Sequence, residues 1–256
     1  MNFLTKNRSK FLIVLVLLFL GYEMFLSRKL SPPANSEQIT ISFRVPEGVM
    51  LLPLGGVYVS SKCTNTRLTG AFKTYQEDAT AGVSLPFVNG VDNLRTVSIA
   101  KDGGGRCKWK LLSIQVRFRA ANDNPLAKGE KVVDTTYDFD FIGYGADGGG
   151  FGTSRTKEVK GDLDIKTDFF PMITKFTDND INLKFFGGDT ANEKWGRRFS
   201  LNGTRHIAIA PVIHLNKVVT LLAPDNTDNW IAIYPDGSKE EIPYIFPDYD
   251  KLLSMK

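Results

Sequence analysis

Hydrophobic and polar residues alternate along the segment "LLSIQVRFR" (111–119). The apolar positions fall on one face of an extended chain and comprise Leu112, Ile114, Val116 and Phe118. The polar positions fall on the other face and comprise Ser113, Gln115, Arg117 and Arg119. A period of two is typical of a β-strand that buries one of its faces. The segment therefore predicts a half-buried strand.

The same kind of pattern recurs along the chain, and no segment has the apolar spacing of an amphipathic helix of three turns. Clusters of Gly, Pro, Asn and Asp separate ten further segments rich in β-branched and aromatic residues, which predicts a strand in each: 38–45, 56–61, 94–100, 131–141, 155–167, 181–186, 205–210, 216–222, 229–234 and 240–246. "PDGSK" (235–239) between two of them predicts a hairpin. We expect an all-β fold, an antiparallel β-sandwich ectodomain.

The sequence gives one signal for an internal boundary in this ectodomain. A proline and a polar cluster in "FPMITKFTDND" (170–180) predict a break between a β-sandwich part, 39–170, and a C-terminal β part, 171–256. One large sandwich and two smaller subdomains both fit the length. The sequence leaves that choice open.

The amino-terminal segment is strongly apolar. Residues 11–26 contain one charged side chain, Glu23, and follow three basic residues. This arrangement predicts a signal anchor or transmembrane helix over 11–27, a cytoplasmic N-terminus over 1–10 and a tether over 28–38. The ectodomain is then periplasmic and the protein is a single-pass protein of the inner membrane. A cleaved signal peptide and a buried core helix are the alternatives.

The formal charge of +4 comes from the amino-terminal region. Residues 1–30 hold five of the 32 Lys and Arg and one of the 28 Asp and Glu, so the remainder carries 27 of each sign. A neutral ectodomain has no electrostatic footprint for nucleic acid. We therefore expect no nucleic-acid partner.

Cys63 and Cys107 are the only cysteines. In an oxidising compartment an even pair predicts a disulfide. The triple glycine 103–105 before Cys107 is interpreted as a turn, because no phosphate-binding helix follows it. We predict no cofactor, no metal site and no catalytic residue, since neither a metal-ligand spacing nor a nucleophile with its base is present.

Alternating acidic residues are the first candidate site. Asp138 and Asp140 share a strand face opposite Tyr137 and Phe139, and Asp164 belongs to a similar acidic alternation. If the two strands pair, their acidic strip would attract a basic partner surface. A solvated sheet face is the alternative interpretation.

Two loops supply the other candidates. Tyr144 and Phe151 lie in the glycine-rich "GYGADGGGFG" (143–152), either a flexible hairpin tip or a loop that presents aromatic anchors to a protein. Trp195, Arg197 and Arg198 combine residue types enriched at protein interfaces. The alternative is a surface loop whose tryptophan packs in the core.

The apolar anchor without a following cysteine, the single cysteine pair and the run "GGRCKWKLLSIQVRF" (104–118) resemble small enterobacterial envelope proteins encoded beside secretion-system effectors. Some of these are immunity proteins against toxins that act in the periplasm. The resemblance implies a protein partner, either a toxin or an envelope component. It assigns no residue a chemical role.

We therefore expect a protein-binding domain anchored in the inner membrane, and the resemblance implies an immunity protein. The alternatives are a β-sandwich glycan hydrolase that uses two of Asp138, Asp140 and Asp164, and a structural component of an envelope secretion or assembly machine. The partner's identity, the oligomeric state and the cleavage of the signal stay open.

Overall fold

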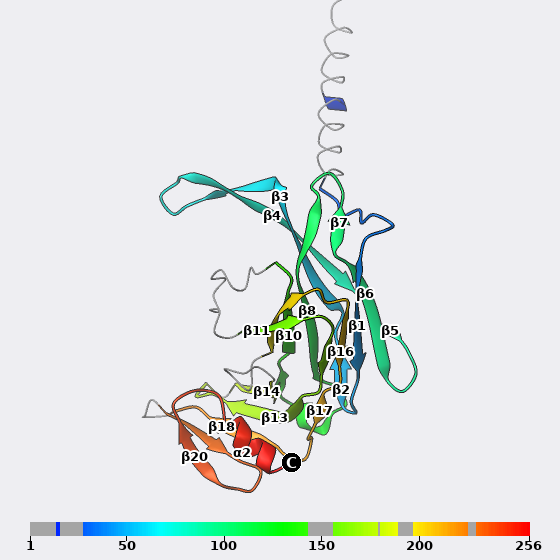
Figure 1. The fold of residues 1–256 in the computed structure, drawn as a ribbon. Coiled ribbons are helices and arrows are strands. Elements are labelled where there is room, and N and C mark those ends of the chain that lie inside the picture. The colour runs from blue at the N-terminus through cyan, green and yellow to red at the C-terminus, as the bar shows by residue number, and fades with distance from the viewer. Residues whose placement is uncertain (1–13, 16–27, 143–155, 179, 189–196, 225–228) are drawn as a thin grey trace, which may run out of the picture. The chain divides into compact units, whose positions relative to one another are not determined.

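The structure is a computed structural model, and the ribbon is shown in Figure 1. It describes residues 14–15, 28–142, 156–178, 180–188, 197–224 and 229–256. The predicted anchor at 11–27 lies outside these residues except for Val14 and Leu15. Among the residues described, no helix has the length and apolar character needed to cross a membrane. The expected all-β fold is confirmed, because strands in several sheets make up most of the described chain.

The chain divides into two compact units. Unit 1 comprises Met1–Glu37, Tyr58–Ala81 and Ala100–Leu111. Unit 2 comprises Gln38–Val57, Gly82–Ile99 and Leu112–Lys256. The predicted boundary at 170/171 lies within unit 2, and whether it separates subdomains stays a prediction.

Unit 1 contains the outer part of a long hairpin. Its strands are β3 (Leu54–Leu68) and β4 (Thr74–Leu85), both of which begin or end in unit 2. Figure 1 shows their outer halves as one long twisted ribbon. The remainder of unit 1 includes β7 (Asp102–Gly104) and the first residues of β8 (Trp109–Ala120), which pair antiparallel with a bulge between Asp102 and Gly104.

Unit 2 contains a five-stranded sheet with the order β12-β16-β1-β6-β5. Its strands are β1 (Gln38–Arg44), β5 (Val88–Asn89), β6 (Leu94–Ala100), β12 (Leu163–Ile165) and β16 (His206–Ile209). The larger, eight-stranded sheet has the order β11-β15-β10-β8-β3-β4, with β2 and β7 also beside β8. Its strands not yet given are β2 (Val49–Leu51), β10 (Thr135–Asp140), β11 (Lys157–Lys160) and β15 (Arg198–Asn202).

The sheets are mixed, which corrects the antiparallel arrangement expected from the sequence. β16 runs parallel to both β1 and β12, and β15 runs parallel to both β10 and β11. Parallel neighbours require long crossover connections. Alternation along a strand encodes which face is buried but not the direction of its partner, so the sequence pattern could not reveal these pairings.

Aromatic side chains fill the space between the two sheets. Phe43 of β1 meets Phe118 of β8 with ring centroids 5.5 Å apart, which joins the five-stranded sheet to the larger one. Phe118 also contacts Tyr137 and Phe169 at 6.1 and 5.2 Å. Phe139 and Phe199 stack at 5.4 Å within the same core. Face-to-face packing of this kind is typical of a β-sandwich.

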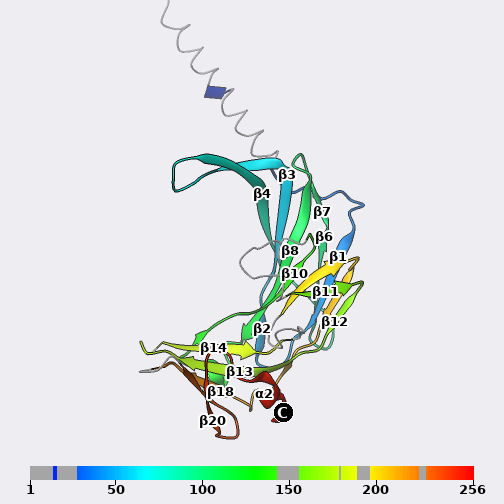
Figure 2. The ribbon, with the colours of Figure 1, turned by 60° about the vertical axis from the view of Figure 1, so that its left-hand side comes forward.

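A third sheet follows in sequence, with the order β20-β19-β18-β13-β14-β9 and with β17 also beside β13. Its strands are β9 (Lys131–Val132), β13 (Asp168–Lys175), β14 (Ile181–Phe186), β17 (Val212–Ile213), β18 (Val219–Leu222), β19 (Trp230–Ile233) and β20 (Lys239–Ile242). Helix α2 (Tyr249–Ser254) lies beside this sheet (Figure 2). Its Tyr249 and Leu252 pack into the hydrophobic cluster on the sheet. The short helix η1 (Pro125–Ala127) precedes β9. The predicted hairpin at 235–239 is confirmed, since β19 and β20 pair antiparallel.

The segment 170–180, predicted as a break, contains most of the interior strand β13. The sequence analysis did not expect a strand here, because proline lacks the N–H that a central strand donates. On one edge, β13 pairs with β17 through Phe169 and with β18 from Met172 onward. Pro171 therefore stands where β13 changes partner.

Candidate functional site

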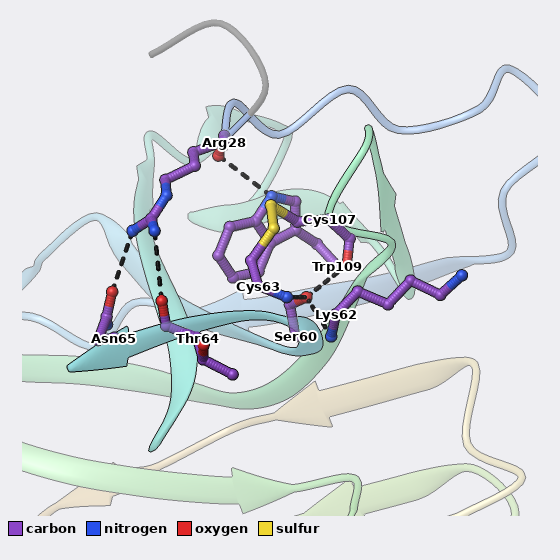
Figure 3. The surroundings of a disulfide bond; sticks show 8 residues. All are labelled: Arg28, Ser60, Lys62, Cys63, Thr64, Asn65, Cys107 and Trp109. Carbon is purple, nitrogen blue, oxygen red and sulfur yellow. Dashed lines mark hydrogen bonds between the residues drawn. A yellow bond between two sulfur atoms is a disulfide. The ribbon is translucent and has the colours of Figure 1, made fainter. Parts of the chain in front are cut away.

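Cys63 and Cys107 form the predicted disulfide, with their Cα atoms 5.3 Å apart. Ser60 fixes the backbone beside it (Figure 3). Its hydroxyl donates a hydrogen bond to the carbonyl of Cys107 and accepts from the backbone N–H groups of Lys62 and Cys63, at 3.2 and 3.1 Å. The disulfide is thus part of a tightly bonded local structure in unit 1.

Arg28, directly after the predicted anchor, is tied to the same region. Its guanidinium donates to the carbonyl of Thr64 at 3.2 Å and to Oδ1 of Asn65 at 3.0 Å. The indole of Trp109 donates to the carbonyl of Arg28 at 3.1 Å. Figure 3 shows these three hydrogen bonds around the disulfide. The chain that leaves the anchor is therefore held against the β3–β4 hairpin within unit 1.

Part of the triple glycine forms the predicted turn, because Gly105 begins a turn in which its carbonyl accepts the Lys108 N–H at 3.2 Å. Gly103 lies in β7, and a Cβ atom on it would come within 2.7 Å of side-chain atoms of Leu30 and Tyr58. Gly104 and Gly105 have φ values of +57° and +68°, which L side chains rarely adopt. The glycines serve close packing as well as the change in direction.

The tip of the β3–β4 hairpin exposes three large apolar side chains. Phe72 is 88% exposed, Leu68 68% and Tyr75 48%. Thr69 closes the turn, since its N–H donates to the carbonyl of Lys73 at 2.8 Å and its hydroxyl accepts from the Lys73 N–H at 3.1 Å. We call residues 68–75 the hairpin tip.

Phe72 occupies the left-handed region with φ of 57°. Glycine and asparagine adopt this conformation more easily, and a bulky residue there costs about 1–3 kcal/mol. Sequence analysis did not single out this tip. The signal was the pattern "LTGAFKTY" (68–75), apolar residues interrupted by turn formers.

The alternation predicted for β10 is present, with Tyr137 and Phe139 buried and Asp138 and Asp140 on the outer face. Within the sheet Asp138 stands opposite Gln115 on one side and Arg198 on the other. Gln115 Nε2 donates to Asp138 Oδ1 at 2.8 Å, and Arg198 Nε lies 3.7 Å from Asp138 Oδ2. Two candidate residues far apart in the sequence, Asp138 and Arg198, are thus neighbours.

Asp164 does not join them. The single strand predicted over 155–167 is two strands, β11 in the larger sheet and β12 in the five-stranded sheet. Gly161, with φ of +80°, and Asp162 separate them, and Asp162 Oδ1 accepts the backbone N–H groups of Arg205 and His206 at 2.9 and 2.8 Å. Because β10 and β12 lie in different sheets, the expected acidic strip does not form.

Two arginines on the outer face of β8 share one carboxylate. Arg117 Nη1 lies 3.9 Å from Asp134 Oδ2, and Arg119 Nη1 lies 3.8 Å from Asp134 Oδ1. Both distances exceed a good N–H···O hydrogen bond. Within the described part of the chain, the buried Nε atoms of Arg117 and Arg119 have no hydrogen-bond acceptor.

Arg197 and Lys184 extend this positive group. Arg197 Nε donates to the carbonyl of Thr136 at 2.9 Å, and its Nη1 donates to the carbonyl of Gly187. Burial lowers the pKa of the Arg197 guanidinium. Burial and then the charge of Arg197 lower the pKa of the Lys184 ammonium, while Asp134 opposes the change. Arg197 thus ties β10 to the chain that leaves β14.

These side chains define what we call the arginine face: the cations Arg117, Arg119, Lys184, Arg197 and Arg198, and the anions Asp134, Asp138 and Asp140. Its formal charge is +2. The planar guanidinium donates in a fork that matches a carboxylate. The face is therefore suited to binding an anionic group.

No protein-family model, curated protein or solved structure matches this chain. The resemblance to immunity proteins accordingly stays a prediction.

The remaining candidates, Tyr144, Phe151 and Trp195, lie outside the described residues. Within those described, no group of three or more His, Cys, Asp and Glu side chains is placed to hold a metal ion.

A polar cluster at Asp168 escaped the sequence analysis. Its Oδ1 lies 2.7 Å from His214 Nε2 and its Oδ2 lies 2.9 Å from Lys256 Nζ. Burial by itself would raise the pKa of Asp168, but its hydrogen bonds to Lys256 and His214 lower it overall. The ring of His214 stacks on Phe170 at 5.0 Å, and the Tyr249 hydroxyl donates to the carbonyl of Asp168 at 2.7 Å. This cluster joins α2 and the C-terminal residue to β13.

Proposed function

We propose that this chain is an exported binding protein whose unit 2 docks an acidic protein partner through the arginine face. The observation that carries the proposal is the sharing of Asp134 by Arg117 and Arg119, at distances longer than a good hydrogen bond. A partner carboxylate would supply the acceptors that Asp134 does not. Arginine is among the residue types enriched at protein interfaces.

The predicted anchor over 11–27 places the protein in the inner membrane as a single-pass protein with a periplasmic ectodomain. The disulfide supports export, because disulfides persist in oxidising compartments. The partner that we propose is a secreted toxin acting on the envelope, which makes the chain an immunity protein. Blocking such a toxin needs an interface of roughly 1,600 Å² in total.

The hydrolase alternative receives no support from the placement of its proposed acids. Asp164 belongs to a different sheet from Asp138 and Asp140, and Asp138 is engaged by Gln115. The scaffold alternative predicts capture of several membrane proteins in place of one partner. The experiment below separates it from the binding proposal.

The test is an affinity capture with the full chain, solubilised from its membrane, against the envelope and secreted fractions of its organism. We compare the native chain with R117Q/R119Q, which removes both charges and keeps polar side chains at both positions. The matched control is K175Q/K239Q, which neutralises two exposed strand positions elsewhere in unit 2. Thermal unfolding of each variant confirms that it is folded.

We expect one stoichiometric partner, an affinity lowered by about 30-fold or more in R117Q/R119Q, and a change of less than about threefold in the control. Equal loss in both variants, or capture of many membrane proteins, would contradict the proposal. Deleting the chain should also sensitise cells to kin that secrete the toxin. Unchanged survival in that competition would remove the immunity function.

A further inference from the structure

The two units differ sharply in charge. The described segments of unit 1 (28–37, 58–81 and 100–111) contain nine Lys and Arg against four Asp and Glu, a formal charge of +5. Unit 2 has a formal charge of −3. The two values sum to +2, which is the zero charge of residues 31–256 plus Arg28 and Lys29. The neutral composition therefore conceals a basic unit joined to an acidic one.

Two basic residues of unit 1 adjoin the exposed apolar tip in sequence. They are Arg67, next to Leu68 and paired with Glu77 at 2.6 Å, and Lys73, next to Phe72. Elsewhere in the unit Lys101 pairs with Glu37 and Lys110 with Asp102. Apolar side chains beside cations are the combination that binds an anionic lipid surface.

Lys62 and Lys108 add a second basic pair. The nearness of Lys108 lowers the pKa of the Lys62 ammonium, because two ammonium groups repel each other. An anion placed against both ammonium groups would relieve that repulsion. Lys62 lies on β3 next to Cys63, and Lys108 follows Cys107, so the two lysines flank the disulfide.

The hairpin is also attached to the chain at the point where the predicted anchor ends. Arg28 follows residue 27 and is hydrogen-bonded to Thr64 and Asn65 of β3. From there Leu68 is only three residues away along the strand, or about 10 Å at 3.3 Å per residue. An anchor in the bilayer therefore holds the tip within reach of the same surface.

We infer that the hairpin tip is a second membrane contact, in which Leu68, Phe72 and Tyr75 enter the interface of an anionic bilayer and the basic residues of unit 1 bind its headgroups. The contact rests on the anchor of the proposed function. It needs little intrinsic affinity, because the anchor already fixes a high effective concentration of lipid. It explains why a bulky side chain occupies a left-handed position at an exposed turn.

The test uses the full chain with Gly70→Cys, labelled with an environment-sensitive fluorophore. A Cβ atom at Gly70 meets no atom within 4 Å, and the native cysteines are joined in the disulfide. The labelled chain is reconstituted into vesicles of neutral phosphatidylcholine or of a mixture with phosphatidylglycerol, both containing an acyl-chain quencher. The control label is at Val91→Cys, an apolar position of unit 2 that is 79% exposed.

We expect at least threefold stronger quenching at residue 70 than at residue 91 in the anionic vesicles. Adding L68S/F72S, or K62E/K73E, should make the quenching at residue 70 equal to that at residue 91. Salt at 0.5 M should weaken the contact by screening the charges. Flotation with the vesicles reports the anchor separately. Equal quenching at residues 70 and 91, in a chain that floats with the vesicles, would overturn the tip contact alone. The same conclusion would follow if the label at residue 70 became shielded only when envelope protein was added. A chain that does not float overturns the anchor as well.

Discussion

Unit 2 and unit 1 are both built of strands, but different forces hold them. In unit 2 the fully buried ring of Phe118 contacts four aromatic rings, those of Phe43, Tyr137, Phe169 and Phe185. In unit 1 the large buried side chains are few, chiefly Tyr58, Trp109 and Leu111, and a disulfide links two of its segments. A small group of strands that cannot bury enough apolar surface needs a covalent link. The comparison predicts that the two units respond to different substitutions.

The largest effect is expected in the aromatic core. Phe118→Ala should destabilise unit 2 by about 3–5 kcal/mol, because it removes a ring and leaves a cavity among four others. Urea unfolding followed by tryptophan fluorescence measures the change. The exposed Ile231→Ala is the control and should change stability by less than about 1 kcal/mol. Equal effects would show that the core does not carry the stability of unit 2.

Removing the disulfide should affect unit 1 next most strongly. Cys63→Ala with Cys107→Ala opens a loop with a sequence separation of 44, for which the expected loss is about 2–4 kcal/mol. Amide hydrogen exchange locates the loss. We expect faster exchange in β3 and β7 and unchanged protection in β13 and β18. Faster exchange throughout both units would mean that they unfold together.

The Asp168 cluster gives unit 2 a dependence on acid. The folded pKa of Asp168 is depressed below its ordinary value, so its contribution to stability is present above about pH 4 and is lost as the pH falls through the folded pKa. Asp168→Asn should cost about 1 kcal/mol at neutral pH through weaker hydrogen bonds, and the difference from the native chain should shrink in acid. Thermal unfolding at pH 7 and pH 3 measures both values. A difference that grows in acid would contradict this sign.

The smallest expected effect is a gain. Phe72→Asn should stabilise the hairpin by about 1 kcal/mol, because asparagine adopts a positive φ more easily than phenylalanine. Slower amide exchange at Lys73 would report it. Phe72→Ala is the matched control, since alanine removes the ring but keeps the unfavourable backbone. No difference between these two variants would mean that Phe72 carries no strain.

The sequence was most informative about features that a local pattern determines, such as which face of a strand is buried. The period of two in β8 and β10 correctly placed Phe118 and Tyr137 inside. The pairing of Cys63 with Cys107 followed from compartment and count. β4 was missed because it buries little besides Ala79 and so lacks an apolar face.

The arginine face depends on register and could not be predicted in this way. Arg117 and Asp134 meet because β8 and β10 pair with Thr136 opposite Arg117. Arg198 reaches Asp138 only because β15 returns from far along the chain to lie parallel to β10. Neither register leaves a local trace in the sequence.

The lengths of the outermost strands bear on aggregation. In the described chain six strands end the three sheets, and five of them have only two to four residues: β5, β9, β11, β12 and β20. Strands this short offer few backbone groups with which a strand of another molecule could pair. The sixth, β4, has 12 residues. Its Glu77 and Asp78 would bring like charges together if two copies met edge to edge. Neutralising them should turn this strand into the template from which fibres grow.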